Sequence, residues 1–330
     1  MMLKPEFVFA TCRAGSEASL KREVASRHGA LLTPAFMRPQ LITWKLRGEI
    51  RDDFVPETAF AAVSGFSIGM ARSAADVVNL VKDGMADVHV YPRIVPEDGV
   101  PEDAWGRVDS VRAEISTALP LVRNSAFILD VILGEEGEPW FVGCHRRSAS
   151  AHPCPGALPR LRLPEDAPSR AWLKMEQALA WLQLDGPGVL AGRTALELGS
   201  APGGASWSLL QRGMRVMGVD TGIMDPRVAA HPSFRHLALP AGDVSFRDLP
   251  REVDLLASDM NLHPGLVVRY AERFVRQLNP RWMILTLKMN DAQVEPMIPA
   301  LLQQIRRFAP GEVSARQLHA NRREITVVAR

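Results

Sequence analysis

The second half of the sequence alternates short apolar runs with amphipathic segments, and this rhythm restricts the possible folds more than any other feature. The pattern predicts four buried parallel strands and two closing strands, at residues 193–199, 215–220, 253–260, 281–289, 313–319 and 324–330. It predicts intervening helices at residues 172–184, 206–212, 264–278 and 293–308. Strands and helices in this order favour an α/β, Rossmann-like doubly wound sheet. Such sheets bind ligands beyond the carboxyl ends of their strands, so we expect the chemistry there.

A proline-rich stretch, residues 148–170, separates this region from the first half. Prolines at five positions between 153 and 168 exclude a long helix or a central strand and predict an extended connector. The expected organisation is therefore an N-terminal α+β region over 1–147, the linker over 148–170 and an α/β domain over 171–330.

The first half mixes predicted strands and helices. The strands are expected at 6–12, 40–46 and 87–93, and as a hairpin of 126–133 and 139–146. The helices are expected at 16–29, capped by Ser16 and ending at Gly29, and at 74–85 and 102–119. This pattern suits one or two small α+β modules. We see no catalytic constellation here, and we interpret His89 and His145 as surface residues or as core residues with satisfied hydrogen bonds.

Composition indicates the cellular compartment of the protein and the charge of its substrate. The three cysteines have no CxxC spacing and are expected to be free thiols in a reducing compartment. No apolar run is long enough for a bilayer and no secretory signal is visible at the start, so we expect a cytoplasmic protein without a membrane partner. Residues 1–150 carry 17 Lys and Arg against 20 Asp and Glu (−3), and residues 151–330 carry 22 against 17 (+5). This difference is a weak sign of a polyanionic substrate, and scatter between two halves is an equal alternative.

A glycine-rich turn follows the first strand of the second half. The run Glu197–Gly204 reads ELGSAPGG, which is neither a dinucleotide fingerprint nor a Walker loop. The next strand ends in Asp220, and a carboxylate there suits the two hydroxyls of a ribose. Asp243 could reach the amino group of an adenine. Each aspartate alone could be an ordinary cap or turn residue, but together they predict an adenosine-like ligand.

The ordered motifs ELGSAPGG, GVD, SDM and LKM resemble the FtsJ-type ribose 2′-O-methyltransferases. Within them, the sequence is most similar to the RlmM-like group of bacterial 23S rRNA cytidine 2′-O-methyltransferases, as the runs FVGCHRR, PSRAWLKMEQAL and RQLHANRREITVVAR also indicate. The likeness is strong over 140–330 and weaker before it, where that group has a ferredoxin-like and a THUMP RNA-binding module. The sequence departs from the group at Glu197, where aspartate is usual, and at Asn290–Asp291, where a second lysine is frequent.

The resemblance implies a class I methyltransferase sheet, S-adenosylmethionine as cofactor and a catalytic set of Lys174, Asp259, Lys288 and Glu324. Asp259 and Lys288 end parallel strands, and Glu324 begins the last strand, so an antiparallel last strand would bring all three to one edge. A buried lysine at the end of an apolar strand needs a charged partner. Without the other three residues, Lys288 could equally be an exposed lysine at a strand end. Lys288 is the candidate general base, oriented by the two carboxylates, and Lys174 would steady the developing alkoxide or a phosphate. Burial would lower the pKa of Lys288 and carboxylates would raise it, and the sequence leaves the balance open.

The same resemblance implies the remaining contacts. The methionine end of the cofactor is expected against Asp259 and against Ser169, Ala201, Pro202, Gly203 and Gly204. Candidate RNA-binding arginines are Arg146, Arg147, Arg160, Arg162, Arg170, Arg322 and Arg323. The expected substrate is a cytidine ribose in 23S rRNA, and the expected state is a monomer.

Four alternatives remain open at this point. The enzyme could methylate a ribose of another RNA, such as a tRNA or a cap, or it could methylate a base, although the loop SDMNLHPG lacks the Asn/Asp-Pro-Pro-aromatic pattern. A catalytically lapsed RNA-binding homologue would not need all four residues of the set. A nicotinamide-dependent dehydrogenase would need a G-x-G-x-x-G turn, which is missing.

Overall fold

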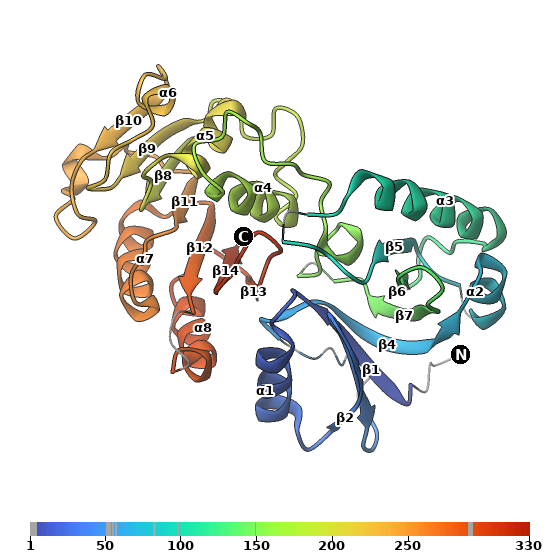
Figure 1. Ribbon diagram of the computed structural model, residues 1–330. Coiled ribbons are helices and arrows are strands. Elements are labelled where there is room, and N and C mark those ends of the chain that lie inside the picture. The colour runs from blue at the N-terminus through green and yellow to red at the C-terminus, as the bar shows by residue number, and fades with distance from the viewer. Residues whose placement is uncertain are drawn as a thin grey trace. The chain divides into compact units, whose positions relative to one another are not determined.

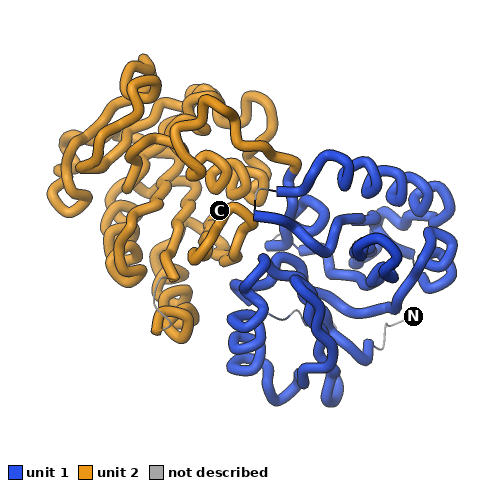
Figure 2. Tube along the Cα trace, in the orientation of Figure 1, with its two compact units in different colours: residues 1–159 blue, residues 160–330 orange. Residues whose placement is uncertain are grey.

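The computed structural model describes residues 5–50, 54, 56, 58–81, 84–97, 99–148, 150–289 and 293–330. The chain divides into two compact units, residues 1–159 (unit 1) and 160–330 (unit 2), shown in Figure 2. The boundary falls inside the proline-rich stretch. Each unit is built on a seven-stranded sheet, and we describe the two units separately.

The sheet of unit 1 has the strand order β2-β3-β1-β4-β7-β6-β5 (Figure 1). Neighbouring strands are antiparallel except for β5 and β6, which are parallel. The strands are β1 (Phe7–Cys12), β2 (Leu32–Arg38), β3 (Leu41–Leu46), β4 (Ala61–Ala71), β5 (Val88–Pro92), β6 (Phe127–Leu133) and β7 (Trp140–Arg146). The helices are α1 (Glu17–His28), α2 (Ala74–Leu80) and α3 (Glu102–Ala118).

Strand β4 joins the two halves of this sheet, because it pairs with β1 on one side and with β7 on the other. The sequence predicted neither β4 nor β2. Strand β4 reads AAVSGFSIGMA, and most of its residues are buried whichever way they point, so the alternation typical of a half-buried strand is missing. Strand β2 contains Pro34, which suits its position at the edge of the sheet. The one or two modules allowed by the sequence are thus a single continuous sheet.

The predicted helix ends in unit 1 need two corrections. Helix α1 ends at Gly29 as expected, but the side chain of Ser16, which precedes it, accepts no capping hydrogen bond among the described residues. Helix α2 ends at Leu80 instead of residue 85, and residues 82–83 lie outside the described residues. Its start is fixed by a capping box, because Ser73 Oγ accepts from Asp76 N and the Asp76 carboxylate accepts from Ser73 N.

The first part of the proline-rich stretch belongs to unit 1 and is not an extended connector. A single 3-10 turn, η1 (Pro155–Ala157), packs against β5 and β4, and Ala157 and Leu158 are buried. Proline is compatible with the first position of such a turn because its missing N–H would have no partner there. The prolines therefore excluded a long helix as expected, but they did not prevent the chain from packing.

The sheet of unit 2 has the order β10-β9-β8-β11-β12-β14-β13. The first five strands are parallel, and β14 runs antiparallel to β12 and β13, as Figure 1 shows. The strands are β8 (Thr194–Leu198), β9 (Arg215–Val219), β10 (Phe234–Leu237), β11 (Leu255–Ser258), β12 (Trp282–Lys288), β13 (Val313–Arg316) and β14 (Glu324–Ala329). The helices are α4 (Ala171–Trp181), α5 (Gly204–Gln211), α6 (Pro226–Ala229), α7 (Pro264–Leu278) and α8 (Ile298–Arg306), with 3-10 turns η2 (Phe246–Asp248) and η3 (Glu295–Met297).

The predicted doubly wound sheet is confirmed. The sequence missed β10 and α6, which have four residues each and are too short for a periodic signal. Helix α7 illustrates how the local sequence builds the layer. Its buried residues include Val267, Ala271 and Phe274, which recur at helical spacing and face β11 and β12. Burial of a side chain such as Phe274 stabilises the fold by about 1.5–3 kcal/mol.

His263 begins α7 by accepting a hydrogen bond from Gly265 N at 3.2 Å, and Asn279 ends it with a left-handed φ of 44°. None of the helices in the described part of the chain combines the length and the apolar character that a bilayer-spanning helix needs.

Candidate active site

Four charged side chains meet at the carboxyl edge of the unit 2 sheet. Lys288 is the last residue of β12, and it lies directly opposite Glu324, the first residue of β14. Asp259 follows β11, and its N–H donates to Leu198 O at 3.0 Å. Lys174 comes from the first turn of α4. The antiparallel direction of β14 therefore brings Glu324 to the edge at which β11 and β12 end, as expected.

These side chains form a closed ring of alternating charge. Lys174 Nζ donates to Asp259 Oδ2 at 3.1 Å and to Glu324 Oε1 at 2.8 Å. Lys288 Nζ donates to Asp259 Oδ1 at 2.8 Å and to Glu324 Oε1 at 2.7 Å. We call these four residues the tetrad. Its two ammonium groups balance its two carboxylates. Charges that are paired in this way can be buried, whereas an unpaired buried charge is strongly destabilising.

The tetrad is mostly buried, with side chains 11–17% exposed. Burial acts to lower the pKa of Lys288, but Asp259 and Glu324 outweigh it, so the pKa is raised above the ordinary value of 10.5. Burial acts to raise the pKa of Glu324, but Lys174 and Lys288 outweigh it and hold the pKa below 4.5. The balance that the sequence left open is thus settled in favour of an ammonium at Lys288.

Lys288 keeps one hydrogen-bond donor for a ligand. An ammonium has three N–H groups, and two of those on Lys288 bind Asp259 and Glu324. The third has no acceptor within the ranges that the structure describes. On the inner side, Lys174, Asp259 and Glu197 line a void of only about 10 Å³, which is at the lower limit for a single water molecule.

Two polar side chains that the sequence reasoning missed hold the tetrad in place. Gln177, one turn after Lys174 on α4, accepts from Ala320 N at 2.8 Å. Asn321 is fully buried, and its Oδ1 accepts from Leu318 N at 2.8 Å and from Thr326 Oγ1 at 3.1 Å. These bonds fix the loop that leads into Glu324. The run LHANRRE carried a signal, because an asparagine in a loop just before a strand often bonds to nearby backbone groups.

Lysine usage is a second signal that the sequence holds. Residues 160–330 contain two lysines, Lys174 and Lys288, and every other basic side chain there apart from histidine is arginine. An arginine stays charged in proteins, whereas a lysine can lose its proton and presents a compact point charge. The restriction of lysine to the tetrad indicates a role that arginine does not fill.

The glycine-rich turn lies beside the tetrad and beside Ser169. Gly203 has a φ of +113°, which favours glycine, and it immediately precedes α5. A Cβ on Gly204 would lie 2.2 Å from Ser169 Oγ and 2.8 Å from Ser169 O. The structure thus brings Ser169 against Gly204, the last residue of the glycine-rich turn.

Asp220 anchors this loop from the end of β9. Its Oδ2 accepts from Ala201 N at 3.0 Å, and its Oδ1 accepts from Gly222 N at 2.7 Å. Each carboxylate oxygen has two lone pairs, so both can still accept a hydroxyl. Asp220 therefore has the turn role that the sequence analysis left open, and this role is compatible with a ribose ligand.

Asp243 is exposed in a loop that is held from α7. The guanidinium of Arg273 donates to Ala241 O, to Gly242 O and to Val244 O at 2.8–3.1 Å. Arg273 is a further positioning residue that the sequence reasoning missed. Arg273 thus holds the backbone of this loop in place, and the exposed Asp243 carboxylate remains accessible to a ligand.

Glu197, the residue that departs from the family, is completely buried in β8. Burial raises its pKa from 4.5 to about 8, and the charges of Asp259 and Asp220 act in the same direction. The opposing influence is Ser206, whose Oγ–H donates to Glu197 Oε2 at 2.5 Å. Glu197 therefore keeps its proton at neutral pH and adds no charge beneath the tetrad.

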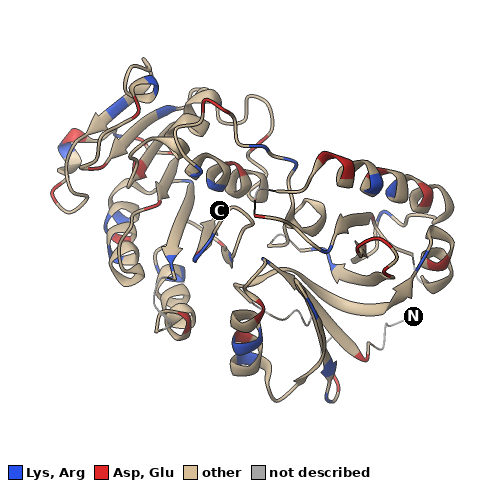
Figure 3. Ribbon diagram, in the orientation of Figure 1, with Lys and Arg blue, Asp and Glu red and all other residues tan. Residues whose placement is uncertain are grey.

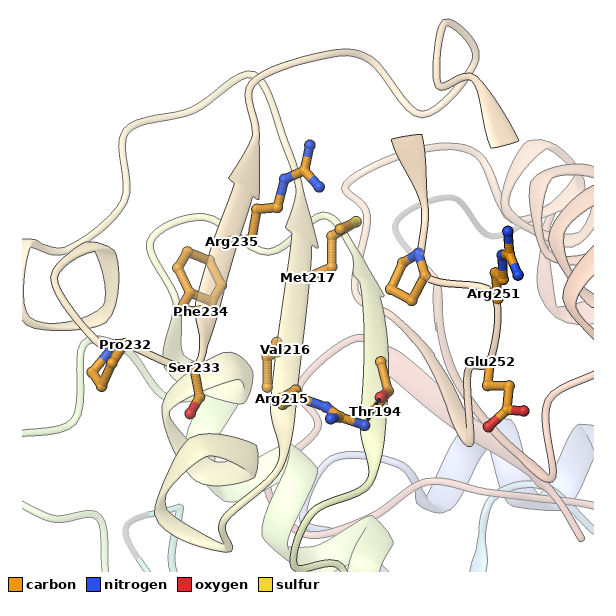
Figure 4. A pocket seen from close by; sticks show the side chains of 11 residues that line it. Thr194, Arg215, Val216, Met217, Pro232, Ser233, Phe234, Arg235, Arg251 and Glu252 are labelled. Atoms are coloured by element: carbon orange, nitrogen blue, oxygen red, sulfur yellow. Dashed lines mark hydrogen bonds between the residues drawn. The ribbon is translucent and has the colours of Figure 1, made fainter. Parts of the chain in front are cut away.

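Unit 2 also has a separate cavity of about 630 Å³ (Figure 4). It is lined by residues of β9 and β10 and by the segment before β11, among them Arg215, Arg235 and Glu252. Thr194 and Arg215 begin their strands, so this cavity extends toward the edge opposite to the tetrad. None of the predicted site residues lines it.

The predicted RNA-binding arginines do not form a single patch that the structure identifies. The exposed ones are Arg147, Arg160, Arg162, Arg322 and Arg323, whereas Arg146 and Arg170 are partly buried. Arg146 packs over the ring of Phe127 at 5.1 Å. In Figure 3, the basic residues of unit 2 are spread over several elements and are interspersed with acidic ones. Charge alone therefore does not locate an RNA surface, and Asn290–Asp291 lie outside the described residues.

Comparison with known proteins agrees with this geometry. The pattern of the FtsJ-like methyltransferase family matches residues 167–297. Three curated relatives are each named ribosomal RNA large subunit methyltransferase M. The protein of Halorhodospira halophila is 36% identical over 177 residues, which cover 53% of this chain and 51% of the relative. The protein of Laribacter hongkongensis is 35% identical over 183 residues (53% and 51%), and that of Azoarcus sp. is 32% identical over 217 residues (63% and 58%).

This chain spans about half the length of the curated relatives that it matches. The matched segment contains Lys174, Asp259 and Lys288 and the glycine-rich turn. The sheet order of unit 2, with β14 antiparallel, is that of the class I methyltransferases. The second unit of this chain therefore contains an FtsJ-like methyltransferase domain.

Proposed function

We propose that this protein transfers a methyl group from S-adenosylmethionine to the 2′-hydroxyl of a ribose in RNA. The observation that carries the proposal is the tetrad, two lysines and two carboxylates that alternate at the carboxyl edge of the sheet. A sugar hydroxyl is a poor acid, so its attack on a methyl group needs a neighbouring group that accepts or stabilises its proton.

The glycine-rich turn and Asp220 fit the cofactor. Gly204 offers a surface without a Cβ next to Ser169, and Asp220 has lone pairs left for the two ribose hydroxyls. When it is bound, the cofactor supplies a methyl group activated by a sulfonium, which becomes a neutral thioether as the new O–C bond forms. Asp243, in the loop whose backbone Arg273 holds, would contact the adenine. Ser169 and Ala201–Gly204 would hold the methionine end together with Asp259.

We assign Lys288 to the reacting hydroxyl because its third N–H has no acceptor among the described residues. Asp259 and Glu324 hold its Nζ in place, and Lys174 balances their charge. In the resting site Lys288 is an ammonium, so it can act as the general base only after it loses a proton. Lys174 would then stabilise the developing negative charge on the oxygen or a neighbouring phosphate.

The proposed substrate is large-subunit 23S rRNA, and the proposed nucleotide is a cytidine. The names of the curated relatives support large-subunit rRNA as the substrate, whereas the choice of a cytidine rests on the resemblance of the sequence motifs. We further propose that unit 1 is a ferredoxin-like and THUMP-like RNA-binding module, that the exposed arginines contact phosphates, and that the protein works as a monomer. A substrate of this kind places the reaction in the cytoplasm.

The test is a methylation assay with methyl-labelled S-adenosylmethionine and total RNA from cells that lack the gene. We expect label in large-subunit rRNA as an alkali-resistant 2′-O-methyl linkage. Lys288→Met should abolish it, whereas Lys21→Met, an exposed lysine of α1, should not. Label in tRNA, in capped RNA or in a base would reject the substrate. Cofactor binding without label in any RNA would indicate a lapsed enzyme.

A further inference from the structure

We propose that His89, Asp130 and His145 of unit 1 form a binding site for a divalent transition-metal ion such as Zn²⁺. One ligand atom from each of these three residues lies within 4.8 Å of the other two. The site is separate from the tetrad, and the proposed methyl transfer does not depend on it.

The sheet itself brings these side chains together. His89 on β5 lies directly opposite Asp130 on β6, and paired residues point to the same face. His145 on β7 lies opposite Ile128, two residues before Asp130, so it projects from that face as well. Three neighbouring strands, visible side by side in Figure 1, therefore each contribute one ligand.

The hydrogen bonding of this cluster is incomplete. All three side chains are buried, and Asp130 is 0% exposed. His145 Nδ1 and Asp130 Oδ2 are 2.6 Å apart, but His89 Nδ1 is buried without a hydrogen-bond partner in the described structure. The expectation that both histidines would be exposed or satisfied is therefore wrong for His89. Buried nitrogens without a partner are rare, and a metal ion would give this one a bond.

The charge states suit a metal. Burial lowers the pKa of His89 from 6.5 to about 4, so its imidazole is neutral and has a free lone pair at physiological pH. Asp130 supplies negative charge that offsets part of the charge of the ion.

Two imidazoles and one carboxylate define the class of ion. This donor set suits Zn²⁺, Co²⁺ and Fe²⁺, whereas Ca²⁺ and Mg²⁺ prefer six or more oxygen ligands. Ligands about 2.1 Å from a shared ion lie roughly 3.4 Å apart in a tetrahedral site. The most widely spaced ligand atoms, within 4.8 Å of one another, must therefore approach by up to roughly 1.4 Å, whereas His145 Nδ1 and Asp130 Oδ2, now 2.6 Å apart, must separate slightly. The fourth position of such a site would be left to water, since the Tyr91 hydroxyl donates to Asp130 Oδ1 at 3.4 Å and keeps its proton.

The experiment is a zinc titration of the full chain after removal of metals with a chelator and dialysis. A competing chromogenic chelator reports the affinity. We expect one tight site per chain, an affinity at least tenfold lower in His89→Gln and in His145→Gln, and a higher unfolding temperature of the wild type with zinc. The matched control is His263→Ser, which removes an exposed histidine and keeps a residue suited to the helix start. A wild-type chain without a tight site, or a His89→Gln variant with undiminished affinity, overturns the proposal.

A second measurement on the wild type guards against variants that do not fold, which circular dichroism would identify. Co²⁺ replaces Zn²⁺ and reports its ligands by absorption. Visible bands of a four- or five-coordinate ion with nitrogen and oxygen ligands support the site. The strong near-ultraviolet band of a thiolate ligand would assign the ion to a cysteine and overturn the proposal.

Discussion

Replacement of Glu197 by glutamine tests how burial controls ionisation beneath the tetrad. Glutamine keeps the shape of the side chain and an acceptor for Ser206, but it cannot ionise. Burial raises the pKa of Glu197 from 4.5 to about 8 in the folded protein. Between these two values the unfolded chain releases a proton that the folded chain keeps.

The sign and size of the effect follow from this difference. Because the folded pKa is the higher one, the wild type loses stability as the pH rises from 4.5 to 8, and the loss is complete above 8. Each tenfold change in proton affinity is worth about 1.4 kcal/mol, so the full loss is at most about 5 kcal/mol. Glu197→Gln lacks this loss, and its stability relative to the wild type should therefore rise by that amount across the window.

Urea unfolding followed by circular dichroism at pH 5, 6.5 and 8 measures this change. The quantity of interest is the difference in the free energy of unfolding between variant and wild type at each pH, because all other titrating groups cancel in it. Glu252→Gln, at an exposed position of the same unit, is the matched control. A difference for Glu197→Gln that stays constant within about 1 kcal/mol from pH 5 to 8 would refute the reasoning.

Three further predictions concern the tetrad and the loop. Lys288→Met should lower kcat by about 10²–10⁴-fold. Lys288→Arg should be equally inactive, because arginine cannot give up its proton. Substantial activity of the arginine variant in the labelled-methyl assay would mean that only the positive charge matters. The activity of the wild type should rise with pH toward the raised pKa of Lys288. Glu324→Gln should shift this rise to lower pH, because it removes a carboxylate that holds the proton on Lys288. An unshifted pH profile would contradict the assignment of Lys288 as the general base. Gly204→Ala should destabilise the protein by about 1–3 kcal/mol and weaken cofactor binding, because the new methyl group meets Ser169; calorimetric titration with S-adenosylhomocysteine checks this, and unchanged affinity would show that the loop can adjust.

The sequence by itself determined most of the architecture of unit 2 and, with the family resemblance, predicted the members of its candidate site. Each buried strand appears in the sequence as a short apolar run, and the residue that follows it lies at the carboxyl edge of a parallel sheet. Asp259 and Lys288 could therefore be placed together before any coordinates, and Glu324 joined them because the resemblance implied an antiparallel last strand. The proline-rich boundary and the longer helices were visible for the same reason, because prolines and helical periodicity act over a few residues.

Only the tertiary structure decided the properties that depend on distant neighbours. The pKa of Lys288 is raised because Asp259 and Glu324 lie within 2.8 Å of its Nζ, and no local pattern gives that balance. Glu197 keeps its proton because the fold surrounds it completely.

Unit 1 shows the same limit more strongly. Strand β4 has no alternation because most of its residues are buried whichever way they point, and the single sheet exists only through its pairing with β1 and β7. His89, Asp130 and His145 are far apart in the sequence, and the register of three strands brings them to one face. Register is a property of pairing between strands, so the sequence of one strand could not reveal that cluster.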